Sequence, residues 1–123
     1  MILVRGYKEA GCGHFQQRFS RENFRAAVHK ATGEVLFKGT LNVRIDRCIR
    51  VKEHFKIRGQ EVGELEDFLF EICRINKFWA YRIRPFDPRT GSGGHGDDTL
   101  EIACSHMIPD VPTYEIELFR DQI

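Results

Sequence analysis

The chain has 123 residues, of which 41% are hydrophobic and 30% are charged, and its formal net charge is +1. These values are typical of one soluble domain with a hydrophobic core, which we place at residues 1–123. The small net charge argues against a general binder of nucleic acid or membrane surfaces, because such proteins carry an excess of basic residues. The apolar run 1–4 is too short for a signal peptide or a spanning helix.

The four cysteines are dispersed along the chain and form no Cys-x-x-Cys pair and no zinc-type cluster with histidine. We therefore expect reduced thiols and a cytoplasmic location, with a disulfide-bonded form left open by the even number. We also expect the chain to be a monomer.

The N-terminal part of the chain is expected to form a strand followed by a glycine loop. Residues 1–7 alternate as a strand, and residues 8–15 read as a loop. Gly11 and Gly13 can turn backbone N–H groups toward an anion, as in phosphate-binding nests, although a plain hairpin turn is the more common use of two glycines. Residues 15–19 are expected to resume as a strand.

A helix is predicted next. Ser20 suits its N-cap, Glu22 lies in its first turn, and Gly33 is placed to end it. Its apolar face is formed by residues at helical spacing, namely Phe24, Ala27, Val28 and Ala31.

Residues 39–46 form the most informative strand. Apolar and polar residues alternate along it, and Gly39 is expected to allow a close backbone approach. Thr40 and Asn42 share one face, which we expect to be exposed. Their hydroxyl and amide oxygens are ligands that Mg²⁺ accepts when phosphates and water complete its octahedron, although turn and ladder roles are more common for such a pair.

The remaining elements are mostly strands. Residues 58–60 suggest a turn, and residues 61–72 fit a helix or a strand about equally well. Further predictions are a hairpin of residues 68–75 and 78–84 that ends at Pro85, a glycine-rich loop over 87–98, and strands at 99–103 and 114–119. One helix among many strands indicates a small β-barrel or sandwich.

The order of these pieces resembles the CTP-dependent riboflavin kinases of archaeal type. The resemblance extends over residues 2–119 and is most specific at Gly-Thr-Leu-Asn-Val, residues 39–43. It implies a mainly β fold with one or two short helices, a six-stranded riboflavin-kinase-like cradle-loop barrel. It also implies transfer of a phosphoryl group from CTP to the 5′-hydroxyl of riboflavin with Mg²⁺, which gives FMN and CDP.

The resemblance also implies residue roles. Thr40 and Asn42 match the magnesium ligands, and Glu101 matches a flavin contact, with Thr90 or Ser92 as a second one. Glu101 is also our candidate base, with Asp46 as the alternative. The matching nucleotide contacts are Ala10, Gly11, Cys12, Gly13, His14 and Phe15 in the glycine loop and Ser105, His106, Met107 and Ile108 after the strand at 99–103.

Two departures lie on the nucleotide side. Cys12 stands between Gly11 and Gly13, and residues 109–112 are short and lack the family's basic residue. They keep two alternatives open: a barrel that binds flavin or nucleotide without turnover, and a partner-docking barrel. The chain lacks the Walker-type glycine-lysine motif, so a P-loop kinase is excluded on its own motif.

Overall fold

The computed structural model describes residues 1–11, 13–36, 39–91 and 96–121. Cys12, Phe37, Ser92 and His95 therefore lie outside the described residues. Its elements in chain order are β1 (Ile2–Glu9), α1 (His14–Phe19), α2 (Glu22–Thr32), β2 (Leu41–Ile45), β3 (Phe55–Ile57), α3 (Gly59–Val62), β4 (Asp67–Ile75), β5 (Phe78–Phe86), β6 (Thr99–Ala103) and β7 (Tyr114–Leu118).

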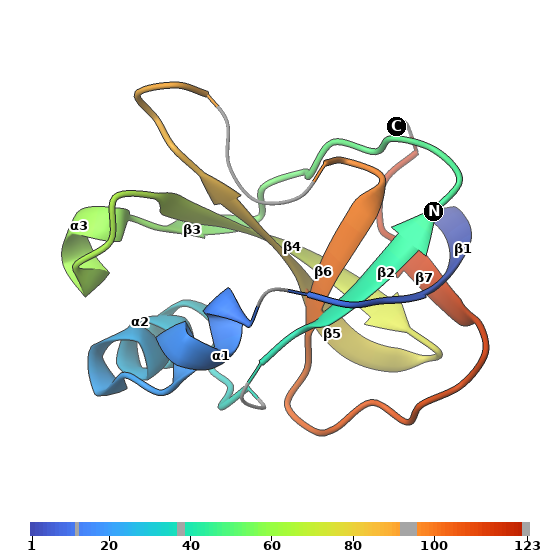
Figure 1. Cartoon of the computed structure of the whole chain (residues 1–123), viewed down its shortest axis with the longest axis horizontal. Helices are drawn as coiled ribbons and strands as arrows, with labels where there is room; N and C mark the ends of the chain where they lie inside the picture. Colours follow the sequence, from blue (N-terminus) through green and yellow to red (C-terminus); the bar gives the residue numbers. More distant parts are fainter. Residues whose placement is uncertain (12, 37–38, 92–95, 122–123) are drawn as a thin grey trace.

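The strands form an antiparallel barrel (Figure 1). Their order is β3-β4-β5-β6-β2-β1-β7, and an additional pairing of β4 with β7 closes six of them into a ring. The short β3 lies outside this ring, on the free edge of β4. The expected small six-stranded barrel is thus confirmed, with one extra strand and with three short helices in the described part of the chain.

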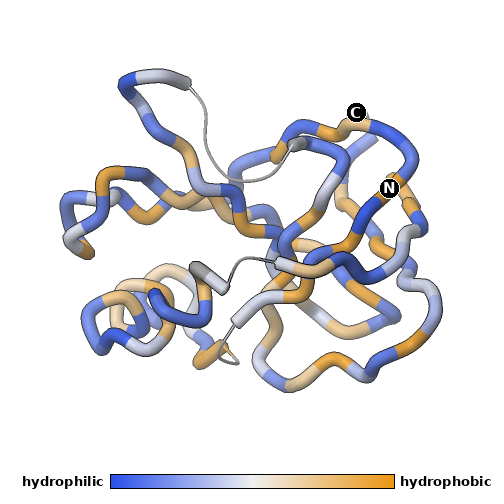
Figure 2. Tube along the Cα trace, viewed as in Figure 1, coloured by the Kyte–Doolittle hydropathy of each residue, from blue (hydrophilic) through white to orange (hydrophobic). Residues whose placement is uncertain are grey.

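Successive side chains of each strand point alternately to the inner and the outer face of the barrel wall. In β2 and β6, the pairs Val43–Leu100 and Leu41–Ile102 face the interior, while their neighbours face outward. Figure 2 shows the same alternation as changes of colour along the strands. The interior is closed by fully buried side chains such as Ile75.

A second core lies outside the barrel, where the helices cover β4 and β5. Phe24 of α2 packs edge-on against Phe68 of β4, with ring centroids 5.2 Å apart. Phe15 and Phe19 of α1 join this cluster, with Phe15 5.7 Å from Phe68 and Phe19 5.2 Å from Phe24. The helices therefore cap one side of the barrel and fix the end of the glycine loop that leads into α1 (Figure 1).

The strand prediction for residues 15–19 is wrong, because this segment is helix α1. Phe15 and Phe19 are one helical turn apart, so a helix buries both rings against the same neighbour, Phe24. Ser20 is likewise not the N-cap of α2. Its hydroxyl donates to the Gln17 carbonyl at the end of α1, and the N-cap position is Arg21, which makes no side-chain capping bond.

The end of α2 and the hairpin are confirmed. Gly33 has φ +74° and donates its N–H to the His29 carbonyl at 2.7 Å. Asn76 and Lys77 form the two-residue turn between β4 and β5, with φ 46° and 73°. The ambiguous stretch 61–72 divides between α3 and β4.

Pro85 does not end β5, contrary to expectation. The strand continues to Phe86, with Pro85 opposite Phe68 of β4. β5 pairs with β6 only at Tyr81 and Arg82, so its other edge is unpaired near Pro85. A missing N–H is tolerated at such an edge.

Candidate functional site

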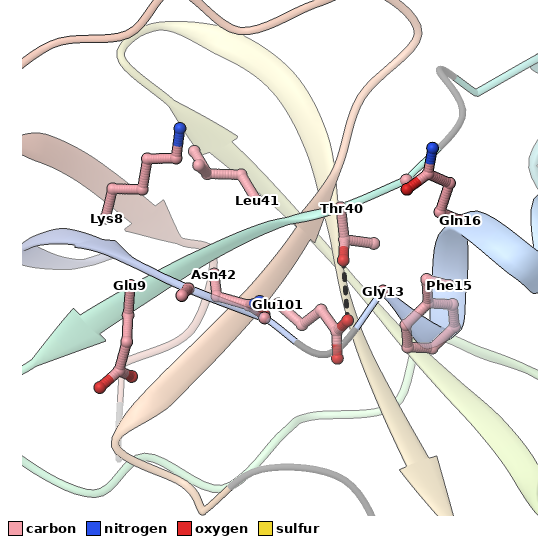
Figure 3. A pocket seen from close by; sticks show the side chains of 12 residues that line it. Lys8, Glu9, Gly13, Phe15, Gln16, Thr40, Leu41, Asn42 and Glu101 are labelled. Atoms are coloured by element: carbon pink, nitrogen blue, oxygen red, sulfur yellow. Dashed lines mark hydrogen bonds between the residues drawn. The ribbon is translucent and has the colours of Figure 1, made fainter.

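Two adjoining cavities open beside the glycine loop, and together we call them the cleft. The first has a volume of about 210 Å³ and lies between the loop after β1 and the start of β2 (Figure 3). The second has a volume of about 430 Å³ and lies between β2 and the segment after β6. Five residues line both cavities, namely Lys8, Gln16, Gly39, Thr40 and Leu41.

Register places three polar residues in a row across the wall of the first cavity. Glu9 of β1 is opposite Asn42 of β2, and Asn42 is opposite Glu101 of β6. Directly opposed residues point to the same face, so this row faces outward from the barrel. All three line the first cavity, which thereby presents a carboxamide between two carboxylates.

The Thr40 hydroxyl donates a hydrogen bond to Glu101 Oε2 at 2.7 Å (Figure 3). A hydroxyl has one proton and two acceptor lone pairs, so this donation leaves the lone pairs of Thr40 Oγ1 as acceptors or metal ligands. The same bond holds the Glu101 carboxylate in place beside the cavity. Thr40 and Glu101 therefore form one positioned unit.

Asn42 contributes an unusual buried oxygen. Its side chain is only 5% exposed, and Oδ1 has no hydrogen-bond partner in the described part of the chain. Each other unpartnered buried atom found there belongs to an ion pair, whereas Asn42 Oδ1 does not. Because an unsatisfied buried acceptor costs about 1–3 kcal/mol, it marks a position where a ligand can bind.

The expectation that the Asn42 amide is exposed is therefore wrong. The physical reason is Gly11, which packs directly over it. A Cβ added at Gly11 would lie 2.1 Å from Asn42 Nδ2, so a larger residue there requires the Asn42 amide or the loop to shift. Gly39 also differs from expectation: the nearest atom to an added Cβ is 3.9 Å away, and glycine is required instead by its φ of +100°.

These residues fit a magnesium ion that is also bound by phosphate. The residues that the structure describes contain no group of three or more His, Cys, Asp or Glu side chains that could hold a metal. Mg²⁺ does not require such a group, because it keeps several waters and takes one or two protein ligands plus substrate phosphates. Thr40 and Asn42 offer one hydroxyl and one amide oxygen on the wall of the same cavity, which is the number of protein ligands that such an ion takes.

The structure gathers most of the sequence-predicted nucleotide residues on the cleft. Ala10, Gly11, Gly13 and Phe15 line the first cavity, and His106, Met107 and Ile108 line the second. Ser105 and Thr90 line neither cavity, and Ser92 and Cys12 lie outside the described residues. His14 begins α1, and its side chain is not described.

Phe15 has a structural role as well. Its ring is almost fully buried in the helix core, and the Arg18 guanidinium lies 4.7 Å from its centroid. Phe15 also lines the first cavity. Asp46, the alternative base, is exposed after β2 and lines neither cavity.

Sequence reasoning missed four polar residues that line the cleft: Lys8, Glu9, Gln16 and Asp110. Lys8 and Glu9 could have been found from their position, because they directly precede the glycine loop in the sequence. Glu9 is held by the Arg44 guanidinium at 3.3 Å and by the Thr99 hydroxyl at 3.2 Å.

The second cavity has a more apolar wall. Ile102, Met107 and Ile108 contribute to it, together with a sulfur and imidazole pair. Cys104 Sγ donates to the Trp79 carbonyl at 3.2 Å and lies 3.7 Å from His106 Nδ1. This cavity can accept a flat ring with polar edges.

Comparison with protein-family models and with curated proteins found no match to this chain. Among the described residues, no helix combines the length and the apolar character needed to cross a membrane. Cys48, Cys73 and Cys104 are free thiols.

Proposed function

We propose that the protein is a CTP-dependent riboflavin kinase that transfers the terminal phosphoryl group of CTP to the 5′-hydroxyl of riboflavin. One observation carries the proposal: Asn42 Oδ1 is buried without a hydrogen-bond partner among the described residues, and Asn42 lines the same cavity as Thr40 and Gly11. This arrangement supports the roles that the family resemblance implies for these two residues.

In the proposal, the two substrates meet in the cleft. In the proposal, backbone N–H groups near Gly11 and Gly13 hold the phosphates, and the wall formed by Met107 and Ile108 receives the base of the nucleotide. The ribityl end of the flavin reaches Glu101 in the first cavity.

The reaction requires positioning more than covalent chemistry. The ribityl 5′-oxygen bonds to the γ-phosphorus, the bond from that phosphorus to the bridging oxygen breaks, and CDP leaves. Glu101 accepts the proton of the attacking hydroxyl and later returns it to solvent. Magnesium, when bound, supplies charge neutralisation at the terminal phosphates. Thr40 keeps the Glu101 carboxylate aligned through its 2.7 Å hydrogen bond.

A second candidate is a barrel of the same architecture that binds flavin or nucleotide without turnover. Its flavin-binding form is favoured by Asp110 on the wall of the second cavity, since a carboxylate there repels the phosphates that the kinase reaction requires. A docking role for an unidentified protein partner has no comparable observation in its favour.

A turnover assay tests the proposal. The purified protein is mixed with riboflavin, CTP and Mg²⁺, and FMN and CDP are separated by chromatography. We expect equal amounts of the two products and none when EDTA is present. Absence of FMN with CTP, ATP, GTP and UTP, with either Mg²⁺ or Mn²⁺, would contradict the kinase proposal. Calorimetric binding of CTP without turnover would then favour the non-catalytic barrel.

A further inference from the structure

We propose that Lys8 binds the phosphate that is transferred, at the junction of the two cavities, and so supplies the positive charge that the residues after Ile108 lack. This inference rests on the proposed function. Lys8 lines both cavities, and so does Thr40, the candidate metal ligand. In the proposal, the phosphate lies at this junction, between the ammonium of Lys8 and a metal ion bound at Thr40.

The charge balance of the cleft makes this lysine necessary. Among the residues found to line either cavity, Lys8 is the one Lys or Arg, whereas Glu9, Glu101 and Asp110 are acidic. Glu9 is partly neutralised by Arg44 at 3.3 Å, but Glu101 and Asp110 add negative potential. A triphosphate entering this cleft is repelled unless cations oppose that potential, and Lys8 supplies one such cation from the protein.

The ammonium of Lys8 is available for a ligand. No hydrogen bond or ion pair engages it within the described part of the chain, and its side chain is exposed. Lys8 and Glu9 leave β1 in opposite directions (Figure 3), because successive residues of a strand face opposite sides. Lys8 is opposite Val43, whose side chain belongs to the barrel interior, so Lys8 lies at the end of the row of interior positions.

This position also accounts for the departure on the nucleotide side. The resemblance leads one to expect a basic residue after Ile108, yet Pro109 and Asp110 stand there. The structure brings Lys8 and Asp110 to the wall of the same cavity from different parts of the chain. A phosphate-binding cation can thus enter the cleft from β1 instead of from the segment after β6. Positive charge held in place where phosphoryl oxygens accumulate charge also lowers the barrier to transfer.

The test compares Lys8→Met and Lys8→Arg with Lys56→Met, a matched change at an exposed lysine of β3 that lines neither cavity. Calorimetry measures binding of inorganic tripolyphosphate with Mg²⁺ and, separately, binding of riboflavin. Steady-state assays with CTP follow. We expect Lys8→Met to weaken tripolyphosphate binding at least tenfold, to reduce kcat by about 100-fold, and to leave riboflavin affinity unchanged. Lys8→Arg should recover part of both losses, and Lys56→Met should match the wild type.

Three outcomes would overturn the inference. If Lys8→Met keeps the tripolyphosphate affinity and the kcat of the wild type, the inference is overturned and the kinase proposal stands. An equal loss of riboflavin affinity in Lys8→Met would assign Lys8 a structural role. Failure of the wild-type protein to bind either tripolyphosphate or CTP would reject the inference together with the proposed function.

Discussion

The candidate site depends on a residue that has no side chain. Gly11 lies so close to Asn42 that any Cβ would meet its amide at 2.1 Å, and this contact helps to bury Asn42, whose Oδ1 has no hydrogen-bond partner among the described residues. The shape of the first cavity and the position of the proposed metal ligand are therefore fixed by the same contact.

The substitution Gly11→Ala should displace the Asn42 amide. We expect at least a tenfold loss of affinity for Mg²⁺ with CDP, measured by calorimetry, and only a small change in the urea midpoint, because the exposed loop can shift at little cost. Gly63→Ala is the control for ligand affinity, because Gly63 lies far from Gly11 in the sequence and a Cβ there has open space around it. The φ of Gly63 is +71°, so this control carries some backbone strain of its own. Unchanged ligand affinity in Gly11→Ala would contradict this account of the glycine.

A second test concerns the Thr40 hydroxyl. Thr40→Val keeps the shape of the side chain but removes the donor to Glu101, so the free energy of unfolding should fall by about 1–2 kcal/mol. Turnover that requires Mg²⁺ should be lost at the same time. Thr113→Val, at an exposed position that lines neither cavity, should change neither quantity in urea denaturation and FMN assays. Full activity in Thr40→Val would rule out its role as a metal ligand.

Part of the site could be predicted at this scale. The two-residue period alone predicts that Thr40 and Asn42 share one face, and both residues line the first cavity. The burial of Asn42 could not be predicted, because it results from Gly11 in a distant loop. The contributions of Lys8 and Glu9 depend on the register of β1 with β2, and a single strand carries no information about its register.

At the scale of elements, the pairing of β7 with β4 closes the barrel. β7 pairs with β4 at three positions, among them Arg74 opposite Glu117. Glu117 is nearly buried there, and its carboxylate lies 3.1 Å from Lys77 Nζ and 2.6 Å from Arg74 Nε. Lys77 foremost, and Arg74 with it, hold the pKa of the Glu117 carboxyl below its usual range.

This pair of contacts predicts a pH dependence. Because the pKa of Glu117 is lower in the folded chain, its contribution to stability is complete above the unfolded pKa of about 4.3 and is lost as the pH falls through the folded value. The free energy of unfolding should therefore decrease below about pH 4.3, and it should decrease less steeply in Glu117→Gln. Urea denaturation at several acidic pH values measures both slopes. Identical slopes would contradict the assignment.

Elements differ in how well their sequences specify them. The β4–β5 hairpin was predicted because long alternating strands flank a two-residue turn, and the structure confirms it. The sequence did not predict helix α1, because a short segment with apolar residues at both ends fits both the two-residue period of a strand and the 3.6-residue period of a helix. Its helical form is selected by contacts with Phe24 and Phe68, which come from later elements.

At the scale of the whole molecule, the barrel encloses charge as well as apolar side chains. Arg82 is 1% exposed, and Glu71 is fully buried 3.8 Å from it. Burial lowers the pKa of Arg82 to about 10, with Glu71 acting in the opposite direction. Glu71 also pairs with Arg120 at 3.1 Å, which connects the chain after β7 to the interior.

Loss of the central carboxylate should destabilise the barrel strongly. Glu71→Leu leaves Arg82 and Arg120 without their shared partner, and breaking a buried pair in this way costs about 3–5 kcal/mol. The free energy of unfolding from urea denaturation measures the effect, with Glu53→Leu at an exposed site as the control. A loss below about 1 kcal/mol would show that the interior charges are well solvated.

The barrel as a whole was predictable, but its cleft was not. Turn signals and alternation indicated a small barrel, and closure through β4 and β7 agrees with that prediction. The cleft combines β1, the glycine loop, β2 and the segment after β6, which are brought together by the pairing of β1 with β2 and of β2 with β6. Its charge balance, and with it the importance of Lys8, follows from that assembly.

The most direct measurement of the central claim uses Mn²⁺ as a paramagnetic substitute for Mg²⁺ in the presence of CDP. Amide signals of the labelled protein near the ion should broaden first at Gly11, Gly13, Thr40 and Asn42, and this broadening should be absent in Thr40→Val. Signals at these residues that stay sharp while those of Asp97 and Asp98 broaden would place the ion elsewhere and contradict the account.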